Sequence, residues 1–166
     1  MSRIGLLCVA LSLLVAESRE LSIANSRCHE GMMSRSVDNL YLKVTRFKAS
    51  VPEDGIKNKK LLKKKTKRLI TKNCRFRDQL LTFYLEDVFG SHHLPVGGEL
   101  RIVEDFQRLK EVLNRCVPCA PSSREMKPIT KMKELFYKLG NKGVYKAIGE
   151  LDILLPWIKS YIDNFK

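Results

Sequence analysis

Two cysteines separated by two residues, Cys116 and Cys119, have a spacing found in thiol redox sites and among zinc ligands. A redox site of that kind needs a surrounding βαβ pattern, and a zinc site needs a second Cys-x-x-Cys or a suitably spaced pair of histidines. The sequence contains neither. Cysteines this close together are better suited to separate disulfide partners, so we expect no metal site and no cofactor.

The histidines do not suggest catalysis either. His92 and His93 lie in a polar stretch and His29 follows a cysteine, with no carboxylate or thiol at a spacing that completes a catalytic triad or a metal site. The Gly-x-Ser-x-Gly motif and the glycine-rich phosphate loop are also missing. We therefore predict no catalytic residues, and the chain is not expected to be an enzyme.

The segment Lys57–Arg68 (KNKKLLKKKTKR) is sharply non-random. Like charges three or four residues apart destabilise a helix, so a purely structural helix gains nothing from them. We predict that this segment binds polyanions, namely sulfated glycosaminoglycans and DNA, without sequence preference; a merely solvated face is the alternative. As a helix it would turn its leucines inward and its cations outward. The predicted polyanion-binding residues are Lys57, Lys59, Lys60, Lys63, Lys64, Lys65, Lys67 and Arg68.

The elements that carry these residues are predicted to be helices. Apolar residues recur at helical spacing along almost the whole chain, and alternating strand-like runs are absent. With the basic segment this predicts an all-α bundle of about six helices. Pro156 predicts a kink near residues 152–156 of the last helix, and Gly140 suits the end of the preceding one. The apolar stripes run over residues 37–51, 69–88, 102–116, 129–139 and 144–162.

The first residues are typical of a secretory signal peptide. Arg3 precedes the apolar run 4–16, and the small residue Ser18 suits cleavage. This run is shorter than the about 20 apolar residues that span a bilayer, and no later stretch is longer. We therefore expect residues 1–18 to be removed and residues 19–166 to form one secreted domain that does not insert into a membrane.

Charge and cysteine content agree with export. The formal net charge is +13, and removing residues 1–18 leaves it unchanged because that segment carries one cation and one acid. A protein this basic attracts polyanions. Loss of Cys8 leaves four cysteines, an even number that predicts two disulfides in an oxidising compartment. Four cysteines allow three pairings, and their spacing does not choose among them.

Residues 141–154 (NKGVYKAIGELDIL) resemble the last-helix signature of the interleukin-10 cytokine family. Residues 81–88 (LTFYLEDV) are similar to the family's third-helix stretch, and the arrangement of the cysteines and the turn at 51–54 also fit. The resemblance covers nearly all of the chain after the signal segment. It implies a six-helix cytokine bundle that can form an intertwined dimer by exchanging its last two helices through the loop before Lys127.

The same resemblance implies disulfides and partners. The first cysteine of the mature chain would pair with the third, Cys28 with Cys116, and the second with the fourth, Cys74 with Cys119. The chain would be a cytokine that binds a class II cytokine receptor heterodimer of the interleukin-20 receptor alpha and interleukin-10 receptor beta type. Signalling would then pass through Janus kinases and STAT transcription factors.

Receptor-binding residues are also implied. Lys146, Glu150 and Asp152 match last-helix positions that contact the ligand-specific receptor chain, and they are expected to point outward because they alternate with residues predicted to be buried. A first-helix surface with Lys43, Arg46 and Lys48 would complete the site. The competing function is that of a cationic host-defence protein, which would act on microbial membranes or nucleic acid through the basic segment.

Overall fold

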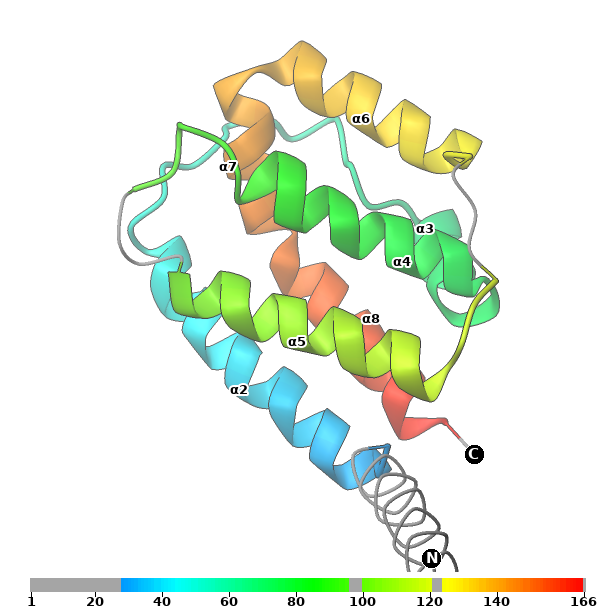
Figure 1. The fold of residues 1–166 in the computed structure, drawn as a ribbon. Coiled ribbons are helices and arrows are strands. Elements are labelled where there is room, and N and C mark those ends of the chain that lie inside the picture. The colour runs from blue at the N-terminus through cyan, green and yellow to red at the C-terminus, as the bar shows by residue number, and fades with distance from the viewer. Residues whose placement is uncertain (1–27, 96–99, 121–123, 166) are drawn as a thin grey trace, which may run out of the picture.

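The computed structural model describes residues 28–95, 100–120 and 124–165, so the predicted signal peptide lies outside the described residues. In these three ranges all regular structure is helical, as predicted (Figure 1). The elements are α2 (Glu30–Lys48), α3 (Lys64–Lys72), α4 (Cys74–Phe83), the π-helical turn η1 (Tyr84–Val88), α5 (Leu100–Cys116), α6 (Lys127–Leu139), α7 (Asn141–Gly149) and α8 (Leu151–Asp163).

The bundle is organised around α8, which packs along α2 and also contacts α3 and α7. Figure 1 shows α2 and α5 side by side, with α6 lying beyond α4 at the opposite edge of the bundle. Each helix buries its apolar stripe in one continuous core. Aromatic contacts join neighbouring helices: Phe83 of α4 packs edge-on against Phe136 of α6, with ring centres 5.0 Å apart.

The single long helix predicted through residues 69–88 is divided at Asn73. This residue is extended, with φ −133° and ψ 104°, and its side-chain oxygen accepts a hydrogen bond of 3.0 Å from the backbone N–H of Phe76. Asparagine is among the best N-terminal caps, so it ends α3 and starts α4. Buried Arg77 then donates to the carbonyl of Ile70 at 2.7 Å, which holds the two short helices together.

The predicted last helix is likewise divided, into α7 and α8. The chain changes direction at Glu150, whose backbone has φ −79° and ψ −3°, just before the range in which Pro156 predicted a kink. Pro156 itself lies within α8. The helix therefore breaks two residues before the predicted range, and the kink at Pro156 stays a prediction.

Two disulfides tie distant helices together. Cys28, just before α2, is bonded to Cys116 at the end of α5, and Cys74 at the start of α4 is bonded to Cys119 after α5. This is the pairing implied by the family resemblance. The two close cysteines therefore reach different partners. None of the helices in the described ranges has the length and apolar character needed to cross a membrane.

The connection from α2 to α3, residues 49–63, is called the strap here because it runs without helix from the end of α2, past α7, to the start of α3 (Figure 1). The helix predicted for the whole basic segment begins only at Lys64. Leu61 and Leu62 are buried as predicted, but they reach the core from the strap. The helical spacing of charge expected for residues 57–63 is therefore wrong.

Candidate functional site

The receptor-binding residues predicted on α2 and on the last two helices fall into three separate environments. Lys48 of α2 forms an ion pair with Asp152 of α8 and also donates to the carbonyl of Gly149 at 3.3 Å. The side chains of Lys48 and Asp152 are 27% and 40% exposed. This pair forms a charged seam between α2 and α8, which we call the α2–α8 seam. Arg46 is exposed two residues before Lys48, and a helix has 3.6 residues per turn, so Arg46 projects from nearly the opposite side of α2, one turn from Lys43.

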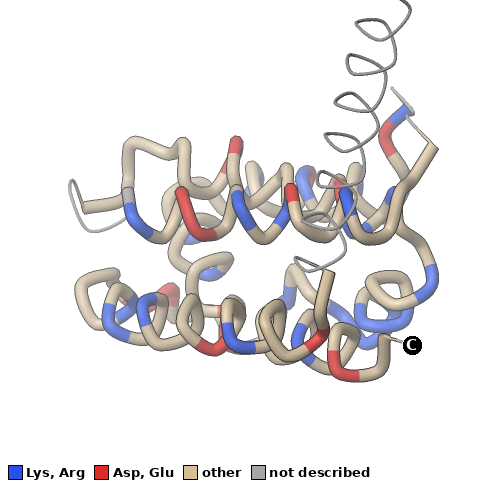
Figure 2. The backbone as a smooth tube through the Cα atoms, turned by 60° about the horizontal axis from the view of Figure 1, so that its bottom comes forward, with Lys and Arg blue, Asp and Glu red and all other residues tan. Residues whose placement is uncertain are grey.

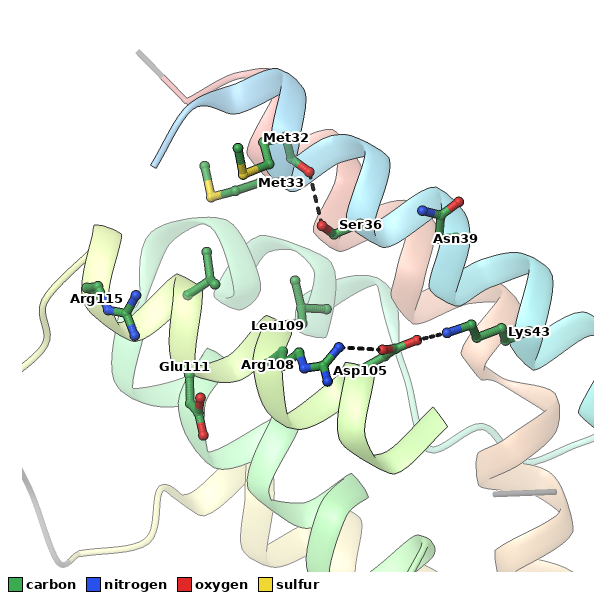
Figure 3. Close-up of a pocket in the computed structure, with 11 residues that line it drawn as sticks. Met32, Met33, Ser36, Asn39, Lys43, Asp105, Arg108, Leu109, Glu111 and Arg115 are labelled. Carbon is green, nitrogen blue, oxygen red and sulfur yellow. Dashed lines mark hydrogen bonds and ion pairs between the residues drawn. The ribbon is translucent and has the colours of Figure 1, made fainter. Parts of the chain in front are cut away.

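Lys43 lies on another side of α2, facing α5. It forms an ion pair with Asp105, whose other carboxylate oxygen is 3.5 Å from the guanidinium of Arg108 (Figure 3). These side chains line a groove of about 580 Å³ between α2 and α5, together with Met32 and Met33. Lys43 therefore does not share a surface with the Lys48–Asp152 pair.

Lys146 and Glu150 are buried, each only 6% exposed, so the prediction that they point outward is wrong. The strap covers the face of α7 and the α7–α8 junction from which these two side chains project. Tyr145, predicted to be buried beside them, is half-buried.

Lys146 and Glu150 form what we call the clamp, because both side chains bind the backbone of the strap. The carboxylate oxygens of Glu150 accept hydrogen bonds from the N–H groups of Leu61 and Leu62 at 3.1 and 2.7 Å. The ammonium of Lys146 donates to the carbonyl of Ile56 at 2.9 Å. It also lies 3.5 Å from Asp54 and 3.9 Å from Glu150. Buried charges are tolerated when they are paired and hydrogen-bonded in this way.

The electrostatics of the clamp follow from its burial. Loss of water raises the pKa of the Glu150 carboxyl above its ordinary value, while the N–H groups of Leu62 and Leu61 and the charge of Lys146 act in the opposite direction. Tyr84, fully buried beneath α7, donates to the carbonyl of Ala147 at 3.2 Å. Burial raises the pKa of this phenol well above its usual range, so it stays neutral.

Sequence reasoning missed the clamp because no pattern marks its partner. An extended strap has no helical period, and it offers backbone N–H and C=O groups that every sequence contains. The two charged residues stand four apart in the sequence, a spacing equally typical of an exposed helical ion pair.

The basic cluster, meaning the eight cations predicted to bind polyanions, is exposed throughout. Four belong to the strap and four to α3. None forms an ion pair with an acidic residue of the described ranges. Figure 2 shows blue turns grouped near the C-terminal end of the chain, where α3 meets α8, while blue and red alternate along other helices.

A groove of about 500 Å³ adjoins the cluster. Its walls come from the strap and α3 on one side and from α6 on the other, where Lys127 and Lys131 add two further cations. Its remaining lining is partly apolar, including Leu69 and Met132. His29, His92 and His93 are exposed, and the described parts of the chain contain no group of three side chains suited to holding a metal ion.

Comparison with known proteins identifies the class of protein. Residues 5–164 match the family model described as Interleukin 10. The chain therefore belongs to the interleukin-10 family and is a cytokine, not an enzyme. Among its relatives, Interleukin-26 of Homo sapiens is 52% identical over 162 residues, covering 98% of this chain and 95% of the relative. Interleukin-10 of Sus scrofa is 32% identical over 94 residues, covering 54% of this chain and 53% of the relative.

Proposed function

We propose that this chain is a secreted cytokine that binds a class II receptor heterodimer of the interleukin-20 receptor alpha and interleukin-10 receptor beta type and activates Janus kinases and STAT proteins. The observation that carries the proposal is the 52% identity to human Interleukin-26 over 98% of the chain. The N-terminal segment, typical of a signal peptide, supports secretion. Its removal is tested by sequencing the N-terminus of the protein released from cells, which should begin near Arg19.

The α2–α8 seam is the part of the predicted site best suited to a receptor. Lys48 and Asp152 retain accessible charge, and their ion pair holds Asp152 in place. Such partly exposed charges contribute mainly to specificity and to the rate of association. Lys43 would contribute from the neighbouring α2–α5 groove. Lys146 and Glu150 would act indirectly, by holding the strap against α7 and its junction with α8.

The test is STAT phosphorylation in cells that carry both receptor chains, compared with cells that lack either one. Reversing charge at the seam and at the predicted receptor residue Arg46, with Asp152→Lys and Arg46→Glu, should raise the half-maximal concentration at least tenfold, about 1.4 kcal/mol of binding free energy. The matched control is Lys138→Glu on α6, an exposed cation outside the seam, which should change it less than twofold. Signalling without either receptor chain, or an unaffected seam variant that folds normally, would contradict the proposal.

We also propose that the basic cluster binds sulfated glycosaminoglycans and DNA. The supporting observation is that its eight cations are exposed and lack acidic partners among the described residues. No aromatic side chain interleaves them, so binding would rest on counterion release and not on reading bases. The host-defence function would use the same cluster, through adsorption to anionic membrane surfaces.

A salt series separates this proposal from general attraction to a basic protein. The double variant Lys64→Gln, Lys65→Gln is compared with the equally charged double variant Lys138→Gln, Lys142→Gln, whose cations are exposed elsewhere. Heparin or DNA affinity should fall in the first variant only, with the log–log salt slope reduced by roughly one unit per lost contact. Equal loss of affinity in the two variants would show that the cluster is only a solvated face and not a binding site.

A further inference from the structure

Residues 57–60 of the strap form what we call the arch, a short stretch between two fixed points. On one side the carbonyl of Ile56 is held by Lys146, and on the other the N–H of Leu61 is held by Glu150. Between them the arch is non-helical and all four residues are exposed. Its backbone forms no hydrogen bond with any described part of the chain. Three of its four residues are lysines: Lys57, Lys59 and Lys60.

These are the features of a protease substrate. Proteases bind their substrates as extended segments through free backbone groups, and exposed loops with unpaired backbone are the preferred sites of nicking. An acidic specificity pocket selects a lysine or arginine on the acyl side of the bond that is cut. In the arch, the Lys57–Asn58 and Lys59–Lys60 bonds combine that residue type with an unpaired, exposed backbone.

We propose that the arch is a processing site at which trypsin-like serine proteases cut the folded cytokine. One water is consumed: the peptide C–N bond after Lys57 or Lys59 breaks, the lysine gains a carboxylate, and the following residue gains an amine. This inference does not rest on the receptor or polyanion proposals, because it depends only on the backbone and lysines of the arch.

Other basic residues of the described ranges are poorer substrates in the folded state. Lys63 is also in the strap, but its carbonyl accepts the N–H of Thr66 at 2.8 Å and its own N–H donates to the Thr66 hydroxyl at 3.1 Å. Lysines within helices have backbones engaged in helical hydrogen bonds. Arg124 lies outside a helix, but its carbonyl accepts a hydrogen bond of 2.9 Å from Gln79, whose side-chain oxygen also accepts the N–H of Met126 at 2.9 Å. That segment is held on both sides of the bond that would be cut. The arch is held only at its ends.

Cutting the arch would give a two-chain molecule that stays covalently joined. The disulfide between Cys28 and Cys116 links the piece that contains α2 to the piece that contains all later helices. Each half of the strap also keeps its own anchor, Ile56 on Lys146 and Leu61 on Glu150. The α2–α8 seam is untouched, whereas the basic cluster is divided between two chains.

The first experiment is brief digestion of the folded, disulfide-bonded protein with trypsin, followed by mass spectrometry. We expect new N-termini at Asn58 or Lys60 to form at least tenfold faster than any terminus within α3 to α8. The product should remain one species of parent mass plus one water until it is reduced. First cuts within the helices, or separation of the pieces without reduction, would overturn the proposal.

Two variants distinguish local opening of the arch from global unfolding. Glu150→Gln keeps the size of the side chain but leaves one backbone N–H of the strap without an acceptor, and should speed arch cleavage about tenfold. Leu113→Ala, a cavity-forming change in α5 remote from the strap, should leave arch cleavage within twofold of the parent. Equal acceleration by both variants would show that the arch is cut only after the whole protein unfolds.

Discussion

Replacing Glu150 with alanine tests whether the clamp is a structural element. The change removes the acceptors of two buried N–H groups, those of Leu61 and Leu62, at 3.1 and 2.7 Å. It also leaves Lys146, whose side chain is 8% exposed, with Asp54 at 3.5 Å as its acidic neighbour. If Glu150 merely pointed into water, replacing it would remove none of these contacts.

The expected loss of stability follows from these contacts. Each unsatisfied buried N–H costs about 1–3 kcal/mol, and removing one partner of a buried ion pair costs about 3–5 kcal/mol. These figures do not add, because the strap can detach and hydrate its polar groups. Detachment would expose two leucines at roughly 1.5–3 kcal/mol each. We therefore expect the free energy of unfolding to fall by about 3–5 kcal/mol, and Tm by about 10 °C.

Denaturant unfolding with both disulfides intact measures the loss, and amide hydrogen exchange at Leu61 and Leu62 locates it. The matched control is Asp152→Ala, which removes a partly exposed ion pair and should cost about 0–1 kcal/mol. If Glu150→Ala unfolds like Asp152→Ala and keeps those two amides protected, the clamp does not hold the strap. If the clamp does hold it, lost signalling in Glu150→Ala cannot be assigned to a receptor contact.

Three further predictions concern the clamp, a disulfide and a turn. Burial raises the folded pKa of Glu150, so the stability of the parent relative to Glu150→Gln should be highest below about pH 4.3 and fall as pH rises through the folded pKa. Denaturant unfolding at several pH values measures this difference, and a stability difference that rises with pH would contradict the prediction. Replacing Cys74 and Cys119 with alanine opens a link across 45 residues and should lower the free energy of unfolding by roughly 4 kcal/mol in denaturant titrations. Gly140→Ala should lower the free energy of unfolding by about 1–3 kcal/mol because φ is +61°, and the added methyl group meets no atom within 4 Å that could cause the loss instead. The control Gly149→Ala, in a helix and equally free of contacts, should stabilise the protein slightly, and equal Tm changes in the two variants would refute the backbone argument.

Much of the helical architecture could be predicted from residue periodicity. The stripes over 102–116 and 129–139 correspond closely to α5 and α6, because a helix that covers a core repeats its apolar residues at its own period. The end of α6 at Gly140 also follows from residue type, since a positive φ favours glycine. The exposure of the basic cluster follows from the cost of burying unpaired charge.

Breaks within a periodic stretch were less predictable. Asn73 divides α3 from α4 although the apolar spacing continues across it, because a cap changes the backbone without changing the pattern. At the other break, Pro156 was the visible signal, yet the chain turns at Glu150. Local sequence therefore gave no signal for the break at Glu150.

What the sequence by itself determined is the class of fold, the apolar faces, the basic segment and the family signature, all properties of residue type and local spacing. What only the tertiary structure decided is which polar face of a helix meets water. Lys146 and Glu150 have the sequence pattern of an exposed pair, but the strap places its backbone N–H and C=O groups against them. Nearly every residue carries the same backbone groups, so the sequence does not show which segment will bind a charged side chain through its backbone. The burial of Lys146 and Glu150 could therefore be recognised only in the tertiary structure.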